Sequence, residues 1–283
     1  MSELLLNRQL YGVALPAVVG LALAALAWGL VRKRGDLTAA VFAGAVAVLG
    51  GGAVAWVDVG QNASDRFWTV GAVLIATFGT AAAMLADKPW PRIGLAAAAG
   101  LVAAGLTYSL VLPADPTWVK TLPLLCLVGP VSAAGAGQVG GLDDVAGRVV
   151  GVASALVLAP VLMVACTYES LAVTAGAAAV ALLVLALVPA KADRLTRGIL
   201  AAGCGLSPML VGGWVYSATL MNDQQHYAAA VALAVPLGAW VALAARRAGP
   251  TWTTAAAVAV TLLIAATAIT LTLTSAALDV YNV

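Results

Sequence analysis

Charged residues divide this chain of 283 residues into long uncharged stretches. Its 14 Lys and Arg, its 12 Asp and Glu and its one His bound ten charge-free windows, of which the shortest has 19 residues. A helix rises 1.5 Å per residue, so about 20 apolar residues cross ~30 Å of hydrocarbon. Each window is therefore long enough to span a bilayer. The windows are 9–31, 37–57, 67–86, 93–114, 121–142, 149–168, 170–190, 198–222, 227–245 and 248–278.

The composition agrees with this division. Hydrophobic residues make up 63% of the chain, charged residues make up 9%, and the mean hydropathy is +1.02. An ordinary soluble domain has about 25% charged residues. Ten spans leave little of the chain for loops, so no soluble domain fits. We therefore predict an all-α polytopic membrane protein whose single transmembrane domain covers residues 1–283.

The basic residues predict the orientation. If the Arg32–Arg34 cluster lies in the cytoplasm and the spans alternate, eleven of the 14 basic residues lie on that side and three on the other. Such a bias on short loops is the positive-inside signal of an inserted protein. It predicts ten transmembrane helices in five hairpins bent on the cytoplasmic side, with both termini outside. We expect the membrane to be the bacterial cytoplasmic membrane. The three outer residues are Arg8, Arg66 and Lys120.

Most of the unusual chemistry falls on the predicted outer face. All six tyrosines and the single histidine lie there. An interfacial aromatic belt explains the tyrosines. A recognition face in which aromatic rings supply contact area and amide groups supply hydrogen bonds is the alternative. We expect alanine at residues 224–226 to preserve the fold and to weaken binding only in that alternative. The candidate recognition residues are Asn222, Gln224, Gln225, His226, Tyr227, Trp118, Tyr168 and Tyr216.

Two windows contain clusters of helix-breaking residues. Prolines interrupt 121–142, and glycines and a proline crowd together in 198–222. Each proline removes a hydrogen-bond donor and collides with the preceding turn. Interrupted spans in transporters use the freed backbone groups to bind ligands, although proline and glycine are also common in ordinary membrane helices. The candidate positions are Pro123, Pro130, Gln138, Gly205 and Pro208.

Small residues are expected to hold the helices together. The chain has 29 glycines, and lipid gives no hydrophobic drive between helices, so association depends on close backbone approach. The hydroxyl groups of window 248–278 are expected to bond carbonyl groups of their own helix. Packing and a polar pathway both remain open as their role. These residues are Thr261, Thr267, Thr270, Thr272 and Thr274.

Residues that carry chemistry are scarce. One histidine cannot supply bis-histidine ligation of a haem. The three cysteines lie far apart, and the adjacent pair Asp143–Asp144 has no further acid close by in sequence. Basic residues form no concentrated face for nucleic acid. We therefore predict no catalytic, cofactor-binding or metal-binding residues, and no enzymatic activity. The cysteines are Cys126, Cys166 and Cys204.

Two functions fit these observations. The first is a non-catalytic structural or accessory subunit of a membrane complex, with the lipid bilayer and other membrane subunits as its partners. The second is an uncoupled carrier or flippase for a neutral or lipid-like solute. Coupled carriers usually place an ionisable residue near the middle of the membrane, and none lies inside any window. Stoichiometric partners in mild detergent would favour the first function, and solute movement in liposomes the second.

Overall fold

The described part of the chain is helical throughout. The computed structural model describes residues 89–110, 144–166, 169–187, 209–217, 222–238 and 249–281, and single positions between 196 and 207. No strand occurs within these ranges, which confirms the all-α prediction for them. Windows 9–31, 37–57, 67–86 and 121–142 lie outside them. The elements are α5 (Pro89–Leu110), α7 (Asp144–Pro160), η3 (Val161–Ala165), α8 (Glu169–Ala186), α10 (Met209–Ser217), α11 (Asp223–Ala234), η4 (Val235–Leu237) and α13 (Pro250–Tyr281).

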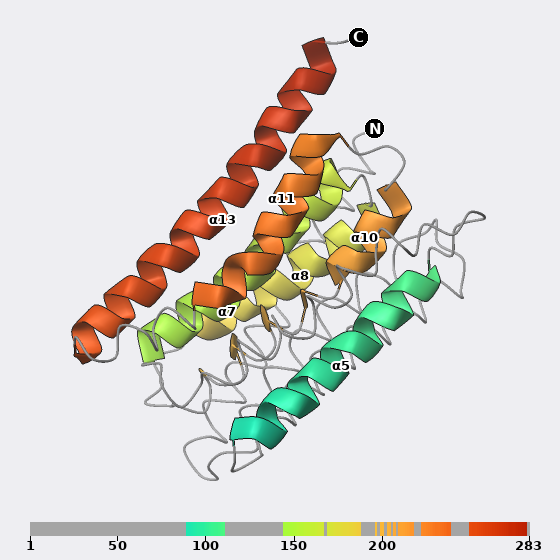
Figure 1. Ribbon diagram of the computed structural model, residues 1–283. Helices are drawn as coiled ribbons and strands as arrows, with labels where there is room; N and C mark the ends of the chain where they lie inside the picture. Colours follow the sequence, from blue (N-terminus) through green and yellow to red (C-terminus); the bar gives the residue numbers. More distant parts are fainter. Residues whose placement is uncertain are drawn as a thin grey trace.

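The helices form one bundle whose axes run in roughly the same direction (Figure 1). Helix α13 lies along one edge and α5 along the opposite edge, with the other helices between them. Helix α7 contacts α8 and α13, α11 packs on α13, and α10 contacts α5. From α7 onward, successive labelled helices alternate in direction (Figure 1). We call one end of the bundle, where α7 and α13 begin, the Arg148 end, and the other, where α11 begins, the Asn222 end.

Among the described residues, two helices are long and apolar enough to cross a membrane. They cover Val145–Ala165, with 21 residues, and Pro250–Ser275, with 26 residues. At 1.5 Å per residue these lengths are roughly 32 and 39 Å. Their length and composition support a membrane protein. The helices also extend beyond the charge-free windows, because α7 already includes Arg148 and α13 continues past Asp279.

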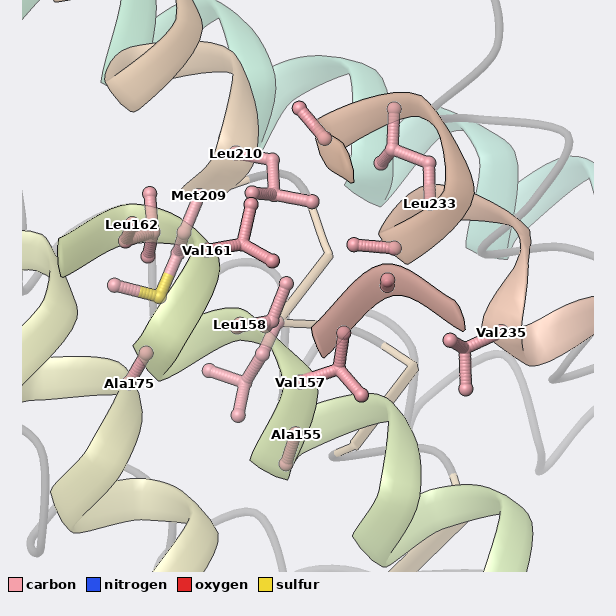
Figure 2. Close-up of a cluster of buried hydrophobic side chains, with 14 of the residues drawn as sticks. Ala155, Val157, Leu158, Val161, Leu162, Ala175, Met209, Leu210, Leu233 and Val235 are labelled. Atoms are coloured by element: carbon pink, nitrogen blue, oxygen red, sulfur yellow. The ribbon is translucent and has the colours of Figure 1, made fainter. Parts of the chain in front are cut away.

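The core lies where α7, η3, α8, α10 and α11 meet (Figure 2). Leu158 of α7 and Leu162 of η3 are fully buried, as is Leu210 of α10. Leu233 of α11 and Val235 of η4 join the same cluster. In a soluble protein, moving a leucine side chain from water into the core stabilises the fold by about 1.5–3 kcal/mol. Between helices in lipid, the stabilisation comes from close packing of the side chains.

Helix α13 is built the opposite way from a helix at the edge of a soluble protein. Its fully buried face consists only of small residues, whereas four of its large apolar side chains are exposed and Ile264, Ile269 and Leu271 are only partly buried against the core. Only 28% of its apolar span is buried, against 61% of the span in α7 and η3. Water penalises this arrangement and lipid does not. The buried residues are Thr253, Ala257, Thr261, Ala265, Ala268, Thr272 and Ser275, and the exposed large ones are Trp252, Leu262, Leu263 and Leu273.

Glycines allow close approach at two places, between two backbones at Gly151 and Gly203 and between a backbone and side chains at Gly213. On α7, a Cβ atom at Gly151 would lie 2.6 Å from the Ile199 carbonyl oxygen. A Cβ atom at Gly203 would lie 2.6 Å from the Gly151 carbonyl carbon, so these two glycines face each other. On α10, a Cβ atom at Gly213 would lie 2.5 Å from Leu162 Cδ2. The expected close approach at small residues is therefore present, and the neighbour of Gly203 is Gly151 of α7.

Arg148 joins three segments at its end of the bundle. Its Nη1 donates a hydrogen bond to the Ala186 carbonyl oxygen at 2.7 Å, and its Nε donates to Thr196 Oγ1 at 3.4 Å. Ala186 is the last residue of α8, where carbonyl groups lack helical donors and the helix dipole is negative. Arg148 is the single basic residue between windows 121–142 and 149–168, and it is therefore bound within the bundle.

Candidate functional site

The segment Asn222–Tyr227 forms the capped start of α11. Asn222 precedes α11, and its Oδ1 accepts a hydrogen bond from the Gln225 N–H at 3.0 Å. Gln225 Oε1 accepts one from the Asn222 N–H at 2.9 Å. This reciprocal pair is a capping box, which satisfies two backbone donors at the start of a helix. Two of the candidate recognition residues thus have a structural role.

The same segment presents three further polar or aromatic side chains. The His226 ring lies against Trp214 of α10, with 5.1 Å between centroids and an interplanar angle of 46°. His226 Nδ1 and Gln224 Oε1 are buried atoms without a hydrogen-bond partner in the described region. Tyr227 is exposed. The structure therefore brings Trp214, which the sequence analysis did not single out, to the candidate recognition segment.

Some of the remaining candidate residues lie in the described part of the chain and others lie outside it. Tyr216 lies in α10, but its side chain is outside the described region. The described positions around the predicted interruption of window 198–222 show turns at Leu206 and Ser207 and a helix that begins at Met209. Those outside the described residues are Trp118, Tyr168, Pro123, Pro130, Gln138, Gly205 and Pro208.

One interruption that the sequence analysis missed lies in the middle of window 149–168. Pro160 ends α7 and has no N–H to donate to the Leu156 carbonyl. The chain continues as the π-helical turn η3, in which the Cys166 N–H bonds the Val161 carbonyl oxygen at 2.9 Å. Such turns shift the register of a helix by one residue and are frequent at functional sites. This turn contacts α8, α11 and α13.

A second missed interruption lies in window 227–245. Helix α11 ends at Ala234, and the Val235 N–H bonds the Ala232 carbonyl oxygen three residues back. Pro236 has no donor, and the Gly238 N–H bonds the carbonyl oxygens of Val235 and Pro236. The regular four-residue ladder is therefore broken from Val235 onward. The short turn η4 contacts both α7 and α13, as η3 does.

The signal for both interruptions was present in the sequence. Pro160 and Pro236 each lie within two residues of the middle of their windows. The interruptions predicted from the sequence rest on clusters of proline and glycine, whereas windows 149–168 and 227–245 each contain only one proline. A single proline is enough to break a helix because it removes a donor and collides with the preceding turn.

Three of the five threonine hydroxyl groups that were predicted to bond carbonyl groups of their own helix do so, and Thr261 does not. The hydroxyl groups of Thr267, Thr272 and Thr274 donate to carbonyl oxygens four residues back at 2.8–2.9 Å, as predicted. Thr261 is fully buried, and its Oγ1 has no hydrogen-bond partner. For this residue the prediction is wrong. Its side chain instead lies against Gly238, directly after η4.

The described residues gather few groups that could react or bind a metal. Among them, no three His, Cys, Asp or Glu side chains come together. Two cysteines in this part of the chain, Cys166 and Cys204, are buried as free thiols. The polar side chains that lie close together in the described bundle are those of the Asn222–Tyr227 segment and the Arg148–Thr196 pair. No family model, curated protein or solved structure matches the chain.

Proposed function

We propose that this chain is a membrane-embedded, non-catalytic structural or accessory subunit of a larger membrane assembly. The observation that supports this role best is the surface of α13. Its buried face uses small residues for contact with α11 and α7, and its other face is apolar and outside the bundle. That outer face alternates alanine with leucine, which permits a second transmembrane helix to approach closely. Its residues are Ala255, Ala259, Leu262, Ala266 and Leu273.

The proposal includes the predicted topology. Ten spans with both termini outside a bacterial cytoplasmic membrane would place the Arg148 end in the cytoplasm and the Asn222 end outside. The direction of the described helices and the position of Arg148 in the first turns of α7 support this orientation. Arginine at a cytoplasmic helix end is the usual retention signal.

Crosslinking from α13 tests the subunit role. A photoreactive residue at Ala259 or Ala266, both exposed, is expected to capture a different membrane protein in a stoichiometric product. The same residue at Ala257 or Ala265, both buried, is the matched control and should give only links within the chain. A chain that purifies in mild detergent without partners, and whose outer-face crosslinks reach lipid only, would contradict the proposal.

The alternative of an uncoupled carrier or flippase is favoured by a separate observation. Two described helices leave the regular α-helical hydrogen-bond pattern inside their charge-free windows, at η3 and at η4, and both turns contact α7 and α13. Backbone outside regular helix is tolerated inside a membrane where it is enclosed by protein or lines a cavity. Purified chain in liposomes would decide this point. Movement of a neutral solute or lipid that increases with the protein-to-lipid ratio would support a carrier.

A further inference from the structure

Exposed tryptophans stand where two helices at the edges of the bundle begin. Trp90 is the second residue of α5 and is 80% exposed, and Trp252 is the third residue of α13 and is 68% exposed. Both helices begin at the Arg148 end, and they lie along opposite edges of the bundle (Figure 1). Tryptophan is enriched at membrane–water interfaces, because its ring is apolar and its N–H can bond polar headgroups. The two rings therefore mark one level at this end of the bundle.

An exposed tyrosine marks a second level at the Asn222 end. Tyr227 is the fifth residue of α11 and is 62% exposed. Helices α11 and α13 run in opposite directions, and a Cβ atom at Gly238 would lie 3.0 Å from Thr261 Cβ, which fixes their register. Tyr227 lies 11 residues before Gly238, so it is level with the residue 11 positions after Thr261, which is Thr272.

The two aromatic levels are one hydrocarbon thickness apart. Thr272 follows Trp252 by 20 residues, which is about 30 Å along a helix. The hydrocarbon core of a typical bilayer has the same thickness, ~30 Å. Between these levels the exposed positions of α13 are alanine, leucine and threonine only. Charged residues return just beyond the second level, at Asp223 of α11 and Asp279 of α13.

The partners of Arg148 agree with a boundary at the tryptophan level. Ala146 of α7 packs against Ala257 of α13, and the two helices run in the same direction. Arg148 is therefore level with residue 259, about 10 Å farther into the bundle than Trp252. A charge at that depth in a membrane requires partners within the protein. The Ala186 carbonyl oxygen and Thr196 Oγ1 supply them.

We propose that lipid headgroups contact Trp90 and Trp252 on one side of the membrane and Tyr227 on the other, with the hydrocarbon core between these levels. The placement rests on the membrane-embedded part of the proposed function. It assigns a partner to the exposed middle of α13 and α5, which is lipid chains wherever no other subunit covers it. It also places the backbone of α13 after Thr272, and the capped start of α11, beyond the hydrocarbon on the Asn222 side.

Spin labels on the full-length chain in dioleoylphosphatidylcholine vesicles test this placement. Collisions with oxygen, which concentrates in hydrocarbon, and with a water-soluble nickel chelate give the depth of each label. The oxygen-to-nickel collision ratio should be greatest at Leu262, midway between the two levels, and should fall to headgroup values at both ends of the series. The chain without introduced cysteines gives the background, since Cys166 and Cys204 are buried. The labelled positions, all exposed, are Trp252, Ala255, Ala259, Leu262, Ala266, Thr270 and Thr274.

Helix α5 supplies a matched series on the opposite edge. Leu101 is exposed and follows Trp90 by 11 residues, or about 17 Å, so a label there should be as deep as one at Leu262. Labels at Trp90 and Tyr227 should be as shallow as one at Trp252. If a label in place of either tryptophan prevents folding, the exposed neighbours 91 and 251 report the same levels.

The possible failures of the two proposals are distinguishable. If every label collides freely with the nickel chelate, α13 lies in water, and the membrane role itself is refuted. If the ratio is greatest more than one helical turn from Leu262, or if a label at Trp90 or Tyr227 is as deep as one at Leu262, the membrane role stands and the placement is overturned.

Discussion

Substitution of Gly151 by alanine tests the close approach between α7 and the segment that contains Ile199 and Leu200. The added Cβ atom would lie 2.6 Å from the Ile199 carbonyl oxygen and 2.8 Å from Leu200 Cα. Both neighbours are backbone atoms, which cannot rotate away as a side chain can. Reaching an ordinary contact of 3.4 Å from 2.6 Å requires the two segments to separate by about 0.8 Å. A gap of that size forfeits a quarter to a half of the dispersion attraction across the contact.

The matched control is Gly176→Ala. Gly176 lies inside α8 as Gly151 lies inside α7, so the gain in helix propensity, about 0.5–1 kcal/mol, is the same in both. A Cβ atom at Gly176 would lie 3.5 Å from Ala159 Cβ, which is an ordinary contact. The difference between the two variants therefore measures packing alone. Overpacking costs about 1–3 kcal/mol, and we expect Gly151→Ala to be less stable than the control by about 2 kcal/mol.

The assay is thermal unfolding of the purified variants in one detergent. For a chain of this size, about 2 kcal/mol corresponds to a Tm difference of roughly 4–8 °C. Gly94→Ala adds a second control, because no atom lies within 4 Å of its Cβ position. If Gly151→Ala were as stable as Gly176→Ala, the two segments would not be in contact at this glycine, and the account of backbone packing would be refuted.

Three further predictions concern topology, packing and capping. Gly213→Leu and Gly205→Leu should each lower the stability by at least about 1 kcal/mol, whereas Gly60→Leu, in a predicted outer loop, should not; equal Tm losses at all three would mean that the packing face is misassigned. Gln225→Ala should cost about 1 kcal/mol through the capping box and Gln224→Ala almost nothing, and a Tm comparison that reverses this order would exclude the cap. In a variant without native thiols, an impermeant maleimide added from outside should label cysteines introduced at positions 62 and 224 but not those at positions 33 and 193. Labelling with the opposite sidedness would contradict the topology.

The capping box changes one expectation from the sequence. Alanine at residues 224–226 was expected to leave the fold unchanged, but Gln225 is buried and bonded to Asn222. A binding test of the Asn222–Tyr227 segment should therefore change Gln224 and His226 alone. The sequence contained the signal, since Asn followed by Gln three residues later is a capping pattern. It was obscured because the charged Asp223 places this segment between two charge-free windows.

The sequence predicted correctly that the described part of the chain is helical. Charge placement is a strong signal because burying a charge in lipid is expensive, so charges mark the ends of helices. It predicted the bounds less well, since Arg148 and Asp279 lie inside helices and not at their limits. The terminal turns of a membrane helix can extend a long side chain to the interface, so a helix does not have to stop at its first charge.

The packing face of α13 could not be found from hydropathy, and the reason is physical. A helix that is apolar all round gives no periodic contrast between polar and apolar residues. In lipid the contrast that matters is size, because close approach of backbones replaces the hydrophobic effect as the source of attraction. The spacing of Thr253, Ala257, Thr261 and Ala265 is four residues, which keeps them on one face of the helix. Leu262, Leu263 and Leu273 occupy the opposite face. Reading residue size at helical spacing would thus have predicted both the buried stripe and the place of Thr261 within it. It would not have predicted that this hydroxyl is unpaired, because that depends on Gly238 and on the break after α11, which are distant in the chain.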